Sequence, residues 1–423
     1  MSRSSHPFYS LALVMTGWLT TPNAASASPS SSLAEAWAAA ELHAQLALSP
    51  MVLSPTMDTP YPLLTEREAA AQQYLNATLQ MNEWNLAGTV EQQLREHHAP
   101  QYTYTLNQWH YDRMLSPQIG ITLGKKVMTW GVGFAFKPLD LIQQEDLRDV
   151  NPLPAEGVYV AALDHYSDTT ALSLIGSLFA EPPLNSQHRE PSLTLRWYQL
   201  RDDDDLYAIA RYSSPRTLEF GAGFTHVIDD SWSVYGAALY QHHQQRLINQ
   251  LTSSDTLFAT DDPMQASKLG AGEKLLSGVQ WSDGVGLTLV AEAWWNSEAY
   301  RKADWQRLTD LTQRQRALGG TVPAQLINGN TAWSSQAFLA ENLLQQNLFL
   351  HLGYDDQHRL TPYAELQISP QDRSGLATAA ITWQNDAHRL TLGARHVVGP
   401  TQAIYRQMPI KQLVWAQWCW SIL

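Results

Sequence analysis

The sequence predicts an all-β fold, a transmembrane antiparallel β-barrel of about 16 strands within a range of roughly 14 to 18. Three observations lead to this fold class. From about residue 80 onward, apolar and polar residues alternate with a period of two. The alternating segments are about 9–11 residues long, which suits a tilted bilayer crossing. The links between them are short and long in turn, as expected when short turns lie on one side of a membrane and long loops on the other.

An export signal is expected before the barrel. Arg3 gives a short basic start, residues 8–19 form an apolar stretch, and small residues follow at Ala25–Ala27. The apolar stretch is too short for a membrane-spanning helix, which needs about 20 residues. We therefore expect a signal peptide over residues 1–27, cut after Ala27, and a chain that leaves the cytoplasm.

Residues 28–79 are expected to form a helical and linker segment that precedes a barrel over residues 80–423. The stretch "SLAEAWAAAELHAQLALSP" is Ala-rich and helix-prone, with Pro50 as a stop. This predicts a short N-terminal helix, either periplasmic or acting as a plug in which residues 33–48 fill the lumen. The stretch "SPMVLSPTMDTPYPLL" contains four prolines and is typical of a linker.

Composition narrows the classes of partner and site. The chain has 27 Lys and Arg against 40 Asp and Glu, and its net charge of −13 argues against a nucleic-acid partner. Cys419 is the one cysteine, which excludes an internal disulfide and a Cys-rich zinc site. The mean hydropathy of −0.28 is compatible with strands that turn every second residue toward a wet lumen. We expect no metal and no cofactor.

The lengths of the links follow a parity. Strands are expected near residues 80–96, 101–112, 118–130, 156–166, 170–180, 191–200, 205–213, 217–227, 232–242, 271–281, 285–295, 346–355, 360–369, 375–385, 388–398 and 410–421. After the even-numbered strands the links are short and mostly Asp-rich, such as "SDT", "DDDD" and "NDA". The long links follow odd-numbered strands, at 131–155, 181–190, 243–270, 296–345 and 399–409. Dividing residues 75–96 into two strands breaks the parity, so one strand is expected there.

The polar faces of the strands supply the expected lumen lining. A charge on the lipid face costs about 2–4 kcal/mol at the bilayer midplane, so charged faces should point inward. The candidates for the lumen lining are Arg196, Arg211, Glu219, Glu292, Arg389 and Arg395. They either set the selectivity of a pore or merely hydrate a wet interior. The aromatic girdle at the membrane interfaces is expected to contain Trp130, Trp197, Trp295 and Trp383.

The link 131–155 is the candidate constriction. It begins with the apolar "GVGFAF", which should fold back onto the inner wall, and it continues with charged residues that could cross the lumen. The constriction residues are expected to be Lys137, Asp140, Glu145, Asp146, Arg148 and Asp149. The alternative is an ordinary exposed outer loop.

The long link 296–345 contains a helix-prone and basic stretch, "AYRKADWQRLTDLTQRQRALG". One interpretation is a solvated loop helix. The other is a surface that contacts lipopolysaccharide phosphates or an anionic substrate.

Catalytic signals are weak. The chain has no GxSxG motif, no phosphate-binding loop and no HExxH pair. The polar groups in "HYSD" and "QHHQQ" are typical of turns. We therefore expect that the chain is not an enzyme and has no catalytic residues.

The stretch "LGKKVMTWGVGFAFKPLDLI" resembles a signature of alginate-export porins and DUF1302-type barrels, in which a strand ending in Trp-Gly runs into a loop. The matching residues are Gly124, Lys125, Trp130, Gly131, Pro138 and Asp140. "LNQWHYD" is also similar to the preceding strand of these barrels, so the resemblance covers roughly residues 106–160. Lys137 stands where the family often has Asn. The resemblance implies a channel in the outer membrane of a Gram-negative bacterium.

The C-terminal strand and the expected partners complete the hypothesis. The barrel-assembly machinery reads apolar residues at every second position before a final aromatic residue. Counting back from Leu423 gives Ser421, Cys419 and Gln417, a poor match, whereas counting back from Ile422 gives Trp420, Trp418 and Ala416, a good match. We expect a pore for the passive passage of small or polymeric solutes, surrounded by outer-membrane lipid and lipopolysaccharide, with the solute and any homo-oligomer left open. The alternatives are a barrel with an enzyme site at its outer rim and a plugged structural or adhesive barrel.

Overall fold

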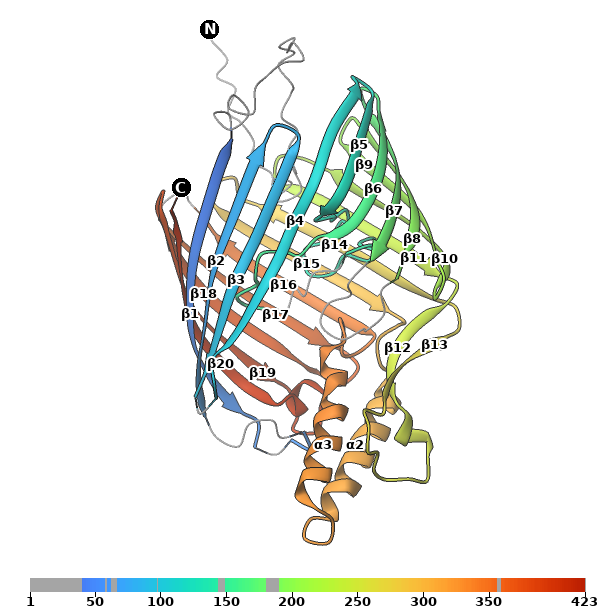
Figure 1. Cartoon of the computed structure of the whole chain (residues 1–423), viewed down its shortest axis with the longest axis vertical. Coiled ribbons are helices and arrows are strands. Elements are labelled where there is room, and N and C mark those ends of the chain that lie inside the picture. Colours follow the sequence, from blue (N-terminus) through green and yellow to red (C-terminus); the bar gives the residue numbers. More distant parts are fainter. Residues whose placement is uncertain are drawn as a thin grey trace.

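The computed structural model describes residues 40–422, apart from residues 58, 62–66, 97, 144–148, 180–189 and 356–358. Within these residues, 18 strands form one antiparallel sheet, and β20 pairs back with β1 to close a barrel (Figure 1). The all-β antiparallel barrel is therefore confirmed, with 18 strands in place of about 16. A two-stranded sheet, β12–β13, is separate from the barrel.

The barrel strands are β1 (Glu41–Pro55), β2 (Glu68–Met81), β3 (Trp84–Arg95), β4 (Gln101–Ser116), β5 (Ile119–Lys126), β6 (Val158–Tyr166), β7 (Thr170–Phe179), β8 (Ser192–Arg201), β9 (Asp204–Ser213), β10 (Thr217–Val227), β11 (Trp232–Gln241), β14 (Gly272–Ser282), β15 (Leu287–Asn296), β16 (Gln346–Tyr354), β17 (Leu360–Ser369), β18 (Ser374–Gln384), β19 (His388–Val398) and β20 (Ile410–Ser421). The remaining elements are β12 (Gln244–Asn249), η2 (Gln250–Ser253), β13 (Met264–Leu269), α2 (Lys302–Ala317), α3 (Ala324–Ser335), η3 (Gln336–Leu339) and η4 (Tyr405–Gln407).

The two additional strands, β1 and β2, lie where the sequence suggests a helix and a linker. β1 pairs with β2 on one edge and with β20 on the other, so the barrel begins at Glu41 and not at residue 80. The expected helix is therefore wrong over residues 41–48, and these residues belong to the wall and do not plug the lumen. Residues 1–39, which include the expected signal peptide, lie outside the described residues.

Pairing on both edges explains why an Ala-rich segment forms a strand. Leu42, Leu48 and Val52 are exposed on one face of β1, whereas Ala47 and Ser49 are buried on the other, so the alternation has period two. Alanine favours helices by only a fraction of a kcal/mol per residue, which tertiary pairing overrides. Pro50 does not stop a helix. It lies at a gap in the β1–β20 ladder, between the pairs at Leu48 and Met51, where its missing N–H costs no hydrogen bond.

The chain also turns within residues 80–96, where a single strand is expected. β2 ends at Met81 and β3 begins at Trp84, and Asn82 takes a positive φ of 49° in the tight turn between them. Dividing this region is thus correct. The alternation of short and long links is nevertheless preserved. The division and β1 together add two strands, an even number, so the short links still follow the even-numbered strands of the barrel.

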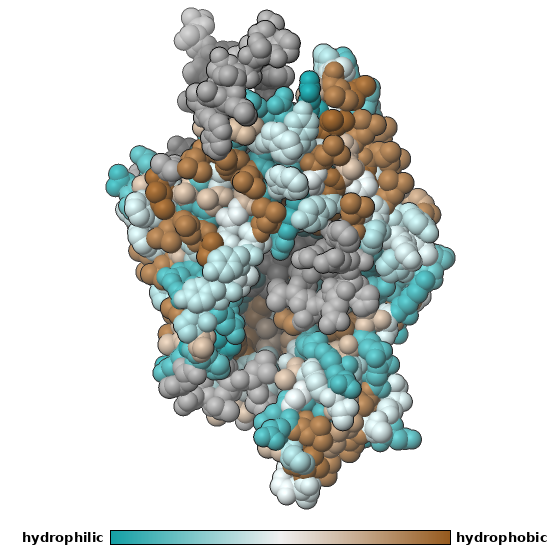
Figure 2. All heavy atoms as spheres, in the orientation of Figure 1, coloured by the Kyte–Doolittle hydropathy of each residue, from teal (hydrophilic) through white to brown (hydrophobic). Residues whose placement is uncertain are grey.

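The two faces of the wall differ in polarity. Leucine and aromatic side chains such as Leu174, Leu193 and Phe220 are exposed on the outward face, and Figure 2 shows many hydrophobic residues on the outside of the strands. The inward face carries most of the buried polar and charged side chains, such as Glu219 and Glu292. This distribution is inside-out relative to a soluble protein and typical of a barrel surrounded by lipid.

The long links gather at one end of the barrel, where α2 and α3 project as a pair (Figure 1). The helices rest on a buried cluster that includes Trp305, Phe338 and Leu344, together with Leu376 of β18 and Val397 of β19. Aspartates close several turns at the other end. Asp283 Oδ1, for example, accepts the backbone N–H groups of Val285, Gly286 and Leu287. Within the described residues, none of the helices has the length and apolar character needed to cross a membrane.

Candidate functional site

The link 127–157 between β5 and β6 folds into the barrel interior. Its residues Val132, Phe136 and Leu139 are buried against inward-facing side chains of the wall. Those wall residues are Ile209, Tyr235, Ala237, Leu239, Leu276, Trp294 and Phe349, from β9, β11, β14, β15 and β16. The apolar start of the link thus packs on adjoining strands of the inner wall, which removes its hydrophobic side chains from water. Together with β6, β7 and β8, which other residues of the link contact, these strands make up the covered half of the wall.

Two glycines of β10, Gly221 and Gly223, form the surface on which the link packs, called the seat of the link below. A Cβ at Gly221 would overlap the Leu139 side chain, and a Cβ at Gly223 would lie 3.0 Å from Leu139 Cδ1. The backbone of β10 is therefore bare where Leu139 rests on it. Phe136 adds a stacked contact with Trp294, with ring centroids 5.5 Å apart.

Glu292 of β15 holds the tip of the link. Its carboxylate accepts the backbone N–H groups of Phe134 and Ala135, the latter at 2.8 Å. It also accepts the Tyr235 hydroxyl at 2.7 Å. Hydrogen bonds to a charged acceptor contribute about 1.5–3 kcal/mol each, so Glu292 is the strongest single polar anchor of the tip.

The sequence signature in the link has a local structural role. Asp140 Oδ1 accepts the N–H groups of Trp130 (2.7 Å) and Gly131, which closes the start of the link on itself. A Cβ at Gly131 would lie 2.7 Å from the Lys137 Cβ and 3.1 Å from Asp140 Oδ1, so only glycine fits this approach. Asp140 is 2% exposed. Its carboxylate is used inside the link, so its expected contribution to the constriction would be to hold the shape of the link, and this stays a prediction.

The far part of the link contacts other parts of the wall. Ile142 packs on Val158 and Val160 of β6 and on Ile175 of β7. Leu153 packs on Ala47, Tyr74 and Cys419, which belong to β1, β2 and β20. Asn107 of β4 donates from Nδ2 to the carbonyl oxygen of Pro154 at 2.8 Å. One continuous link thus contacts the covered half of the wall and also β1, β2, β4 and β20.

The remaining constriction candidates fall into two groups. Lys137 is half-buried, and Asp149 is exposed and accepts the N–H of Asn151 at 3.0 Å. Glu145, Asp146 and Arg148 lie outside the described residues, so their contribution stays a prediction.

The six lumen-lining candidates lie on the inward face but in different environments. Glu292 is covered by the link, and Arg211 and Glu219 form a buried ion pair at 2.6 Å. These three do not face open lumen, because each is at most 3% exposed. The other three are Arg196, Arg389 and Arg395. Arg389 is exposed, with Nη2 3.6 Å from Cys419 Sγ, and Arg395 is half-buried and donates to Thr378 Oγ1 at 2.8 Å.

One member of the expected aromatic girdle is misplaced. Trp130 packs against the clusters of the interior, and the Arg196 guanidinium lies 5.7 Å from its ring centroid. It cannot belong to an outer girdle, since the link has carried it inside. Trp197, Trp295 and Trp383 alternate with the inward residues of their strands and so take the outward side.

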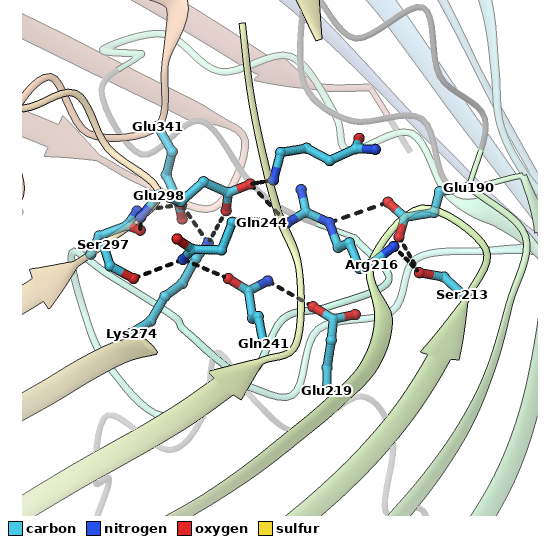
Figure 3. A network of polar contacts seen from close by, with 12 residues as sticks. Glu190, Ser213, Arg216, Glu219, Gln241, Gln244, Lys274, Ser297, Glu298 and Glu341 are labelled. Atoms are coloured by element: carbon cyan, nitrogen blue, oxygen red, sulfur yellow. Dashed lines mark hydrogen bonds and ion pairs between the residues drawn. The ribbon is translucent and has the colours of Figure 1, made fainter. Parts of the chain in front are cut away.

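An ion network joins the covered half of the wall to the long links, and its members are buried or partly buried (Figure 3). Its centre is Lys274 of β14, whose Nζ lies 3.3 Å from Glu298 and 3.1 Å from Glu341. Arg216 bridges Glu298 at 2.7 Å and Glu190 at 3.4 Å, and Glu190 lies 3.3 Å from Arg211. The described network holds three cations, Arg211, Arg216 and Lys274, and four carboxylates, Glu190, Glu219, Glu298 and Glu341.

The network shifts the pKa values of Glu298 and Arg216, two members that lie in links and not in the strands of the wall. Burial favours the neutral form of Glu298, but Arg216 and Lys274 outweigh it and lower the pKa of its carboxyl from 4.5 to about 2. Burial likewise disfavours the charge on Arg216, yet Glu298 and Glu190 raise the pKa of its guanidinium above the ordinary range. These groups therefore stay charged, and removing one partner would leave an uncompensated buried charge.

Sequence reasoning missed most of this network. Glu190, Arg216, Glu298 and Glu341 lie in links, where charges usually face solvent. Lys274 could have been found from the sequence, because it occupies one of the inward-facing alternate positions of β14, near the start of that strand. Among the described residues, no group of three or more His, Cys, Asp or Glu side chains is arranged to hold a metal ion.

Comparisons with known proteins identify the fold. No protein-family model matches the chain, and no curated protein is similar to it. Three structures from Pseudomonas aeruginosa are similar, each with a TM-score of 0.52: OccK5 (OpdH), OpdL and the outer membrane protein OpdK. OccK5 is 9% identical, and the match covers 90% of this chain and 99% of OccK5. OpdL is also 9% identical, with 91% of this chain and 98% of OpdL covered. OpdK is 7% identical, with 90% of this chain and 98% of OpdK covered. The resemblance of residues 106–160 to alginate-export porins and DUF1302-type barrels stays a prediction. The chain has the closed-barrel fold of these outer-membrane proteins.

Proposed function

We propose that the chain is a channel in a bacterial outer membrane, through which solutes diffuse past a constriction formed by the link 127–157. One observation carries the proposal. The link lies inside a closed barrel and contacts the inner faces of β9, β10, β11, β14, β15 and β16 and also of β1, β2 and β20. A chain segment that reaches several sides of a lumen narrows it, and the hydrogen bonds of Glu292 to the tip favour the position inside the barrel.

The polarity of the wall supports passage on the uncovered side. Inward residues of β17, β19 and β2, such as Thr361, Arg389 and Gln72, keep part of their surface exposed, whereas those under the link are buried. A solute would therefore pass along the polar half. Passage needs no energy source, which agrees with the absence of a nucleotide-binding motif from the sequence.

Planar-bilayer recording of the purified, folded protein tests the channel. We expect discrete conductance steps, with a heat-modifiable band on gels as the control for folding. Folded protein that produces no steps would contradict the proposal and favour a plugged structural barrel.

A second recording tests the charged part of the constriction. Neutralising Glu145 and Asp146 together should shift the reversal potential in a salt gradient, because charges at a narrowing control ion selectivity. Neutralising Glu83 and Asp168, which lie in turns at the opposite end, is the matched control. An unchanged reversal potential in the first variant would exclude these two carboxylates from the narrow part of the pore.

A further inference from the structure

The helix α2 presents a basic face that the channel does not use. Its buried face comprises Trp305, Leu308, Leu311, Thr312 and Gln315, so the opposite face is exposed. Among the exposed residues are Lys302, Arg307 and Arg314. In a chain with a net charge of −13, such a face at the projecting end of the molecule is unusual.

The two arginines line an open groove between α2 and η2. The groove is formed by Thr252, Arg307, Asp310, Gln313, Arg314 and Ala317. Arg307 and Arg314 are two helical turns apart and point the same way. Arg307 has one partner, Asp304 at 2.5 Å, whereas no described carboxylate lies within ion-pair distance of Arg314 or Lys302. Arg314 therefore offers a positive charge in the groove that no described carboxylate pairs with, beside Arg307, which Asp304 partly neutralises.

The helix that carries these arginines is held firmly. Trp305 Nε1 donates to the carbonyl oxygen of Leu343 at 2.6 Å, and Gln315 Nε2 donates to that of Leu257 at 2.6 Å. Asp304 also pairs with Arg246 at 3.2 Å. An anion would thus meet guanidinium groups on a rigid element, so ordering them on binding costs less entropy than it would on a mobile loop.

We propose that the α2 groove binds phosphate groups of lipopolysaccharide. Guanidinium groups match phosphate geometry through paired N–H donors. The groove is lined mainly by α2. This helix projects at the end of the barrel where the long links gather (Figure 1). The proposal rests on the outer-membrane orientation proposed above, in which this end faces the leaflet that contains lipopolysaccharide. Asp310, between the two arginines, opposes binding.

The experiment measures the affinity of the full-length protein in detergent for bisphosphorylated lipid A and for lipid A whose phosphates have been removed. The double variant Arg307→Gln with Arg314→Gln should bind the phosphorylated form roughly 10- to 30-fold more weakly, at about 1 kcal/mol for each arginine. Asp310→Asn should bind about twofold more tightly, because it removes a like charge. Wild-type protein should bind the dephosphorylated form weakly.

A matched control removes the same charge elsewhere. Arg113→Gln with Arg201→Gln alters two exposed arginines at the opposite end of the barrel, and its affinity should equal that of the wild type. Equal losses in both double variants, or equal binding of dephosphorylated lipid A, would overturn the proposal. Conductance of the Arg307/Arg314 variant should match the wild type. If the protein binds lipid A through α2 but produces no conductance, the proposed channel function is wrong and the proposed lipid A site is still supported.

Discussion

The covered and uncovered halves of the inner wall obey the same alternation but carry different side chains. Under the link, the inward positions of β10 include Gly221 and Gly223, and those of β11, β14 and β15 include Tyr235, Leu276 and Trp294. On the other side, the inward positions of β19 include Arg389 and Arg395. Inward-facing side chains therefore have two different environments in this barrel. Those of the covered half pack against the link, and those of the uncovered half remain accessible to solvent and solute.

The difference shows why a polar face cannot be equated with a pore lining. Glu219 and Arg211 satisfy the alternation as well as Arg389 does, yet they neutralise each other in a buried pair. Glu292 is occupied by backbone N–H groups of the link. Among the charges of the wall, those on the uncovered half remain available to change the selectivity of a pore.

The largest effect is expected from filling the seat of the link. Gly221→Leu would overlap Leu139 and displace the link from the wall. Single-channel conductance should rise roughly twofold or more, because it depends on the free cross-section of the pore. Ala222→Leu is the control, since that position faces outward. If Gly221→Leu folds and conducts like the wild type, the link does not limit the pore.

A smaller effect on the current is expected from weakening the hydrogen bonds that hold the tip of the link, at Phe134 and Ala135. Glu292→Gln keeps the shape of the side chain but loses charge-assisted hydrogen bonds worth about 1.5–3 kcal/mol each. The current should become noisier, with brief openings above the normal level, while the mean conductance changes little. Glu91→Gln, on the uncovered half, removes the same charge without touching the tip. Identical noise in both variants would show that Glu292 does not hold the link.

Selectivity separates the two halves more finely. Arg389→Gln should move the reversal potential toward cation selectivity, with roughly a twofold change in the permeability ratio, because its guanidinium is exposed in the lumen. Arg113→Gln, which faces outward, should leave the reversal potential unchanged. No difference between these variants would place the solute path away from β19.

Acid should act on the covered half through the ion network. The pKa of Glu298 is lowered to about 2 in the folded protein, so its stabilisation is complete above pH 4.5 and is lost as the pH falls from 4.5 toward 2. The loss should reach at most about 3 kcal/mol in the free energy of unfolding. Urea unfolding at pH 6 and pH 3 measures it. Glu298→Gln should be less stable at pH 6 and less sensitive to acid, and an unaltered pH dependence would assign the effect to another carboxyl.

Local sequence patterns determined much of this barrel. Period-two alternation assigned each recognised strand its inward and outward faces, because successive side chains point to opposite sides of a sheet. The parity of the links placed the long loops at one end, and the apolar start of residues 131–142 indicated a link that returns to the wall. These features depend on neighbours a few residues apart, which a sequence displays directly.

Closure of the barrel decided the rest. Residues 41–48 resemble a helix until β20, more than 350 positions away, supplies a second edge to pair with. Asp140 and Glu292 resemble lumen charges until the folded link brings backbone N–H groups to their carboxylates. Lys274 and Glu341 are 67 residues apart and meet only when β14 and the link before β16 lie together. Long-range partners of this kind are set by the register of all 18 strands, and that register is a property of the closed sheet.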